Sequence, residues 1–227
     1  MKNLTTSKLM ATANKHQTLN KIVCFADFKH YHKNNPTEHQ VMSFEEVVAR
    51  IETVTILKSG INAKFEDGTS VCVGFDGSYI RRNKLGQKQS SRETNSVTGI
   101  NWRNRHIQIY IYGKKILLER FVAVCCDITN DTLALYYDEL AANVMDGSGS
   151  LETADYLNIC VNFEPSNLEW CTRSENASHG AKIKDLYKIT GHVYRFSAED
   201  AELDRLMKSR DFQAIKDYCE NNLFRVR

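Results

Sequence analysis

The chain has little that would punctuate it and nothing that would anchor it in a membrane. Its 227 residues include two Pro and seven Cys, and no apolar run approaches the roughly 18 to 20 residues that span a bilayer. No CxxC pair is present, and Cys125 and Cys126 are adjacent, so neither a zinc-ribbon spacing nor a disulfide framework is visible. The first 17 residues lack the apolar core of a secretory signal. We therefore expect a cytoplasmic protein with reduced thiols and no membrane contact.

Positive charge is missing from one long stretch of the chain. Residues 121–170 contain nine Asp or Glu and no Lys or Arg, whereas residues 76–120 contain ten Lys or Arg against three acidic residues. The net charges of these two segments are −9 and +7, although the whole chain carries only +2. Because opposite potentials attract different partners, we expect the two segments to face different molecules.

The basic segment has the composition of a nucleic-acid contact. Its Lys and Arg side chains are interleaved with Asn, Gln, Tyr and Trp, which can contact sugars and bases while the cations neutralise phosphates. A merely solvated loop usually mixes the two signs of charge more evenly. The residues expected to contact double-stranded DNA are Arg81, Arg82, Lys84, Lys88, Arg92, Arg103, Arg105, Lys114 and Lys115.

The acidic segment has two interpretations. Its carboxylates can face solvent without a partner, or they can form a surface that binds a basic patch on another protein. Under the second interpretation, Asp138 and Glu139 are the candidate contact residues.

Periodicity and turn signals predict an α+β fold. Ser43 with Glu46 three residues later forms a capping-box pattern that predicts a helix over residues 43–54. Asp67-Gly68 between alternating runs predicts a β-hairpin. The basic stretch that follows is rich in Ser, Asn and Gln and is expected to be a loop.

Further along the chain, the pattern predicts two strands joined at Gly113, then a helix that begins near Glu119. Two short helices are expected after residue 190, with Ser197 capping the first and a break near residues 209–211. We expect three regions: a helical and β-hairpin region over 1–75, a basic loop with the central domain over 76–190, and a C-terminal helical hairpin over 191–227.

Three blocks of residues resemble those of the HNH homing endonucleases found in phage genomes and introns. "KKILLERFVAVCC" is similar to the strand and helix that open the family's domain, "NVMDGSG" to its middle block, and "PSNLEWCTRSENASHG" to its closing block. The resemblance covers residues 97–182, and the closing block is the most specific of the three. It implies a ββα-metal core, in which a two-stranded ribbon and a helix hold one divalent ion.

The resemblance also implies which residues form the site. Asn143 and Asn167 fall on metal-site positions of the family, and His179 or Asn176 lies on the following helix. The family cleaves DNA with a His that deprotonates water and a metal ion that stabilises the leaving oxygen. If the site is retained, the ion is expected to be Mg²⁺ or Mn²⁺.

Two departures from the family pattern concern the chemistry itself. The general-base His should follow Asn143, but that position is Val144, and the His of the first block is replaced by Glu119. Valine cannot accept a proton, and loss of a general base typically costs on the order of 100- to 10,000-fold in rate. Asp146, in the Asp-Gly pair, is either a metal ligand or part of a turn.

Three functions remain consistent with these residues. The first is a phage-type DNA-binding protein on a degenerate HNH scaffold, with little or no cleavage. The second is a protein-binding regulator or inhibitor of a nucleic-acid machine in a bacterial host, acting through the acidic face. The third is an active, metal-dependent nicking endonuclease whose base comes from another His, with His179 as the weak candidate.

Overall fold

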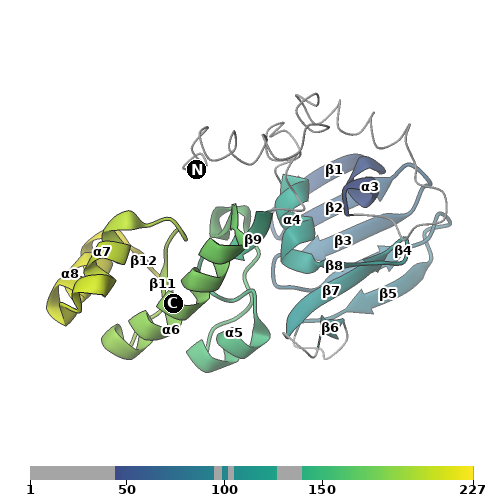
Figure 1. Cartoon of the computed structure of the whole chain (residues 1–227). Helices are drawn as coiled ribbons and strands as arrows, with labels where there is room; N and C mark the ends of the chain where they lie inside the picture. Colours follow the sequence, from purple (N-terminus) through teal and green to yellow (C-terminus); the bar gives the residue numbers. More distant parts are fainter. Residues whose placement is uncertain (1–43, 95–98, 102–104, 127–139, 227) are drawn as a thin grey trace, which may run out of the picture.

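The computed structural model describes residues 44–94, 99–101, 105–126 and 140–226, and combines α-helices with antiparallel β-sheets. Its strands are β1 (Ile51–Leu57), β2 (Gly60–Phe65), β3 (Ser70–Gly74), β4 (Tyr79–Arg82), β5 (Lys88–Arg92), β6 (Ile100–Asn101), β7 (His106–Ile111), β8 (Lys114–Leu117), β9 (Leu140–Val144), β10 (Leu168–Thr172), β11 (Tyr194–Arg195) and β12 (Phe224–Arg225). Its helices are α3 (Phe44–Ala49), α4 (Leu118–Cys126), α5 (Leu151–Leu157), α6 (Arg173–Thr190), α7 (Ala201–Ser209) and α8 (Phe212–Asn222), with a 3-10 turn, η3, at Pro165–Asn167. The large sheet lies at one end and α7 and α8 lie at the other (Figure 1).

The first five strands form one antiparallel sheet in the order β1-β2-β3-β4-β5. The hairpin predicted at Asp67-Gly68 is confirmed, because this turn joins β2 to β3. Gly68 adopts φ 84°, where a side chain would be strained, and Asp67 Oδ1 accepts a hydrogen bond from the backbone N–H of Thr69 at 2.9 Å.

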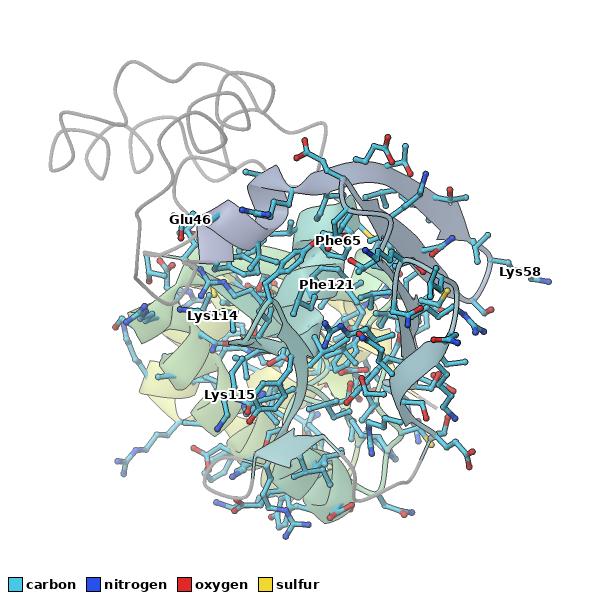
Figure 2. The ribbon with its side chains drawn as sticks, turned by 90° about the vertical axis from the view of Figure 1, so that its right-hand side faces the viewer. Glu46, Lys58, Phe65, Lys114, Lys115 and Phe121 are labelled. Carbon is cyan, nitrogen blue, oxygen red and sulfur yellow. The ribbon has the colours of Figure 1, made fainter. Side chains whose placement is uncertain are left out.

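One face of this sheet packs on α4 and the β7–β8 hairpin. Alternate residues of β2 and β3 are buried, which is the period-2 pattern of a strand with one solvated face. Phe65 of β2 and Phe121 of α4 are both 0% exposed and lie in the interior between sheet and helix, whereas Lys58 extends from the sheet into solvent (Figure 2).

Two predictions for this region are wrong. The helix expected over residues 43–54 ends at Ala49, and the β-branched run that follows forms β1. The basic stretch expected to be a loop forms β4 and β5, which pair from Tyr79 to Arg92. Residues 51–92 thus form one sheet, which runs across the division expected between residues 75 and 76.

The β7–β8 hairpin and α4 follow the predicted pattern. Tyr112 and Gly113 both adopt positive φ, at 49° and 78°, as a two-residue hairpin turn requires. The helix expected near Glu119 begins at Leu118, and its residues Phe121, Val122 and Val124 are 0% exposed.

A two-stranded ribbon followed by a helix forms the centre of the molecule. β9 and β10 pair antiparallel, with Leu140 opposite Thr172 and Val144 opposite Leu168. Helix α6 starts at the residue after β10. Thr172 and Glu175 form a complete capping box at the start of α6. Trp170 of β10 is 6% exposed and packs in the main core.

The C-terminal helices α7 and α8 share a second core with α6. Leu203, Ile215 and Cys219 pack in the same buried cluster as Ile183 and Leu186 of α6. The predicted break between the two helices is confirmed, but the predicted cap is wrong. Asp200, rather than Ser197, caps α7 by accepting from the N–H of Leu203. In the described part of the chain, no helix combines the length and apolar character needed to cross a bilayer.

Candidate functional site

Asn143 lies on the ribbon with its side chain turned inward. It is 3% exposed, and its Nδ2 donates to Oε1 of Glu169, its cross-strand partner on β10, at 2.7 Å. The same Glu169 oxygen accepts from the backbone N–H of Ala198 at 2.6 Å. The amide therefore helps to fix a carboxylate that holds the C-terminal segment against the ribbon.

Asn167 ends η3 and is completely buried. Its Nδ2 donates to the carbonyl of Asn162 at 2.8 Å, and its own carbonyl accepts from the N–H of Met145 at 2.9 Å. Its side-chain oxygen Oδ1 is buried and has no hydrogen-bond partner among the described residues. Asn167 thus ties the end of β9 to the start of β10, and it keeps one unused acceptor.

His179 lies on α6 and is 1% exposed. Its Nε2 donates to the carbonyl of Phe196 at 3.0 Å, and the two rings lie 4.5 Å apart. Burial, with a smaller contribution from the nearby Lys182, lowers the pKa of His179 to about 4, although the hydrogen bond to Phe196 opposes this shift. The imidazole is therefore neutral at pH 7 and enclosed by its own chain.

Val144, at the position where the resemblance expects a base, is packed in the core. Val144 is 5% exposed and belongs to the main core, and a Cβ atom on Gly149 would lie 2.6 Å from its Cγ2. An imidazole in place of Val144 would have no room on that side unless the loop moved. Asp146 is buried and its Oδ1 accepts from the N–H of Ser148 at 2.9 Å, so it forms the turn that was one of its two interpretations.

These residues do not fit a divalent ion. The two positions that the resemblance gives to metal ligands are amides, which bring no negative charge, whereas Mg²⁺ and Mn²⁺ favour carboxylate oxygens. Nδ2 of Asn143 already donates to Glu169. Within the described ranges, no group of three or more His, Cys, Asp or Glu side chains could hold a metal ion.

Residues 194–198, the covering segment, lie over the ribbon and α6. Tyr194, Phe196 and Ala198 are buried, and the backbone of this segment is held at several points. Phe196 donates to the carbonyl of Met145, and the carbonyl of Ala198 accepts from Lys182. His179 donates a hydrogen bond to this covering segment at Phe196, and Glu169 accepts one from it at Ala198.

A His–Glu pair with a buried carboxylate was missed by sequence reasoning. His106 Nδ1 and Glu119 Oε1 lie 2.7 Å apart, and the side chain of Glu119 is 2% exposed. Burial of His106 opposes its charged form, but the hydrogen bond and charge of Glu119 outweigh this and raise its pKa. The signal was Glu119 itself, a charged residue within the apolar run "LLERFV". Glu119, at the position where the resemblance expects a His, is therefore the partner of a His on β7.

Apart from Arg92, the basic side chains of the β4–β5 hairpin reach the surface. Lys84 and Lys88 are exposed and Arg81 and Arg82 are half-buried. Among the described residues, none of Arg81, Lys84 and Lys88 has an ion-pair partner.

The turn of this hairpin is held by its own side chains. Asn83 Oδ1 accepts from the N–H groups of Leu85 and Gln87 at 3.0 and 2.9 Å, and Asn83 Nδ2 donates to Gln87 Oε1. The cations of the hairpin are therefore displayed on a fixed turn.

The remaining candidates for DNA contact are placed differently. Arg92 is 3% exposed, so its guanidinium does not belong to the accessible surface. Arg105 pairs with Asp155 of α5 at 3.2 Å. Lys114 and Lys115 lie at the β7–β8 turn, with Lys115 Nζ 5.6 Å from the ring centre of Tyr110. Arg103 lies outside the described residues.

The two candidate protein-binding residues, Asp138 and Glu139, also lie outside the described residues. The described acidic side chains nearest to them in sequence are not uniformly exposed. Asp146 is buried and Glu169 is half-buried, whereas Glu152, Asp155 and Glu164 are exposed.

No protein-family model matches the chain, and no curated protein or solved structure matches it.

Proposed function

We propose that the chain is a DNA-binding protein that uses the β4–β5 hairpin, on a scaffold that resembles an HNH homing endonuclease without its cleavage site. The observation that carries the proposal is the set of exposed cations on β4–β5, which have no carboxylate partner among the described residues. The hairpin is the outermost strand pair of the five-stranded sheet, with β5 at its edge, and β-strands can contact the grooves of duplex DNA.

Two features support the loss of cleavage. Val144 occupies the position of the base, and the neutral His179 donates its Nε2 hydrogen to Phe196 beneath the covering segment. The side-chain amide of Asn143 is also engaged within the chain, because its Nδ2 donates to Glu169 Oε1. The active-enzyme alternative would need a base and a charged ligand set from other residues.

The salt dependence of duplex binding tests the proposal. The logarithm of the binding constant falls against the logarithm of salt concentration by roughly 0.9 per phosphate contact. We expect the double variant Lys84→Ala and Lys88→Ala to bind more weakly and to lose roughly 1.8 from that slope. Fluorescence anisotropy with a labelled duplex, between about 50 and 200 mM salt, measures both quantities.

The matched control is Lys208→Ala with Lys216→Ala. These exposed lysines lie on α7 and α8, at the opposite end of the molecule from β4–β5, and their removal changes the net charge equally (Figure 1). Equal loss in both variants would mean that only net charge matters, and it would reject the hairpin as the contact surface. Absence of duplex binding by the wild type would favour the acidic-face alternative.

A further inference from the structure

An exposed aromatic ring lies on the small β11–β12 ribbon, away from every residue discussed above as a candidate for DNA contact. Phe224 is 60% exposed, and the guanidinium carbon of Arg195 lies 4.6 Å from its ring centre. The register pairs Arg195 directly with Phe224, so the two side chains lie on the same face. A cation at this distance from an aromatic ring is attracted by the ring's electrons.

The side chains around this ring are held in place. Arg195 Nη1 donates to Ser166 Oγ at 3.3 Å, and Arg225 Nη2 donates to His192 Nδ1 at 2.8 Å. The ribbon itself is fixed by the N–H of Val226, which donates to the carbonyl of Val193 at 2.8 Å. The ring and both guanidinium groups are therefore positioned before any ligand arrives, which lowers the entropy cost of binding.

The chemistry of this patch favours a planar, negatively charged ligand. An apolar protein partner would need a continuous apolar surface, but the strand neighbours of Phe224 include Arg195 and the exposed Arg225. A nucleobase stacks on an aromatic ring, and its phosphate pairs with arginine. Paired bases within a duplex do not offer a free face, so the ligand must be unpaired.

We propose that Phe224, backed by Arg195, is a stacking platform for an unpaired nucleobase of single-stranded nucleic acid, with Arg195, on the same face as the ring, contacting the adjacent phosphate. This platform is separate from the β4–β5 hairpin and takes a different form of nucleic acid. It does not depend on duplex binding by the hairpin.

The chain contains a matched control for the aromatic ring. Phe212, at the start of α8, is 58% exposed, and within the described part of the chain no cation stacks on it. Replacing either Phe by Ala removes the same exposed group, but only Phe224→Ala removes a ring backed by a guanidinium.

The experiment measures the affinity of the full chain for a labelled oligo(dT) of about 15 nucleotides by fluorescence anisotropy. We expect Phe224→Ala to bind roughly tenfold more weakly, because stacking on one aromatic ring contributes about this much per base, and Phe212→Ala to bind like the wild type. Equal affinity of the two variants, or no binding by the wild type, would overturn the proposal.

A second variant guards against a purely structural effect. Phe224→Trp keeps the stacking surface, so it should retain the affinity, and its added tryptophan fluorescence should be quenched when the oligonucleotide binds. The wild type, with Trp102 and Trp170, gives the reference signal. Retained affinity without quenching beyond the wild type would mean that the base does not stack there, and would reject the platform.

Parallel titrations separate this proposal from the proposed function. With a duplex, the variant Lys84→Ala with Lys88→Ala should weaken and Phe224→Ala should not. With oligo(dT), Phe224→Ala should weaken the affinity by the same factor whether the hairpin is unaltered or carries Lys84→Ala with Lys88→Ala. Loss of duplex binding alone would end the hairpin proposal and leave the platform intact. An oligo(U) titration of the same variants distinguishes RNA from DNA as the source of the base.

Discussion

The central ββα unit and the β4–β5 hairpin use their polar side chains in opposite ways. In the ββα unit, Asn143, Asn167 and His179 are at most 3% exposed and donate to their own chain. On the hairpin, Lys84 and Lys88 are exposed and have no partner among the described residues. The polar groups of the ββα unit are thus used within the fold, whereas the charges of these two lysines remain available to an external ligand.

Two residues of the ββα unit, Asn143 and Val144, are of kinds that suit a packed core. Burying a neutral amide with a hydrogen bond costs less than burying a carboxylate, and valine needs no hydrogen bond at all. Asn143 and Val144 are residues of these two kinds, at 3% and 5% exposure. The covering segment, residues 194–198, then completes the core by accepting a hydrogen bond from His179 and donating one to Glu169.

The largest effect should come from acidifying His179. Its folded pKa of about 4 lies below the ordinary 6.5, so the stability of its neutral, buried form is present above pH 6.5 and is lost as pH falls toward 4. Between about pH 7.5 and pH 4, the wild type should lose about 3 kcal/mol more than His179→Gln. Urea unfolding at both pH values measures this, and equal losses would contradict a buried, neutral His179. Lys88→Ala, on the hairpin, should keep the wild-type pH dependence.

Glu169 should rank second. Glu169→Ala leaves Nδ2 of Asn143 and the N–H of Ala198 without their acceptor, so the free energy of unfolding should fall by about 2 kcal/mol or more. Glu169→Gln keeps an acceptor oxygen and should recover part of the loss, and Lys88→Ala should change stability by less than about 0.5 kcal/mol. If Lys88→Ala lowered the free energy of unfolding as much as Glu169→Ala, the proposed difference between the ββα unit and the hairpin would be wrong.

The smallest effect concerns the His106–Glu119 pair. The folded pKa of His106 is raised, so the stability from its charged form is fully present below the ordinary 6.5 and is lost as pH rises through the folded pKa. The advantage of the wild type over His106→Gln in free energy of unfolding should therefore be greater at low pH than at high pH. Chemical denaturation across this window is the measurement, and a difference that grows with pH would have the wrong sign.

Local patterns predicted the elements whose signals depend on few residues. The turns at Asp67-Gly68 and Tyr112-Gly113, and the start of α4 near Glu119, follow from backbone requirements and hydrophobic periodicity. The β4–β5 pair was missed because its burial does not alternate: β5 has two exposed residues, two half-buried ones and then the buried Arg92. Sheet neighbours, rather than its own sequence, make this segment a strand.

The polar residues of the site could be named from the sequence, but their roles could not. His179 and Asn167 owe their burial to the covering segment and to η3, which come from other parts of the chain. His106 and Glu119 are 13 residues apart and meet only because β7 and α4 pack together. The pairing of Arg195 with Phe224 likewise depends on two strands that are distant in sequence.

The most direct test of the account is incubation of the purified chain with supercoiled plasmid in Mg²⁺, in Mn²⁺ and in EDTA. If the ββα unit is a core and the hairpin binds DNA, the plasmid should be retarded on a gel in all three conditions and should remain supercoiled after the protein is removed. Nicked or linear plasmid that appears with metal and disappears with chelator would contradict the central claim, because a working base and ion would then have to exist.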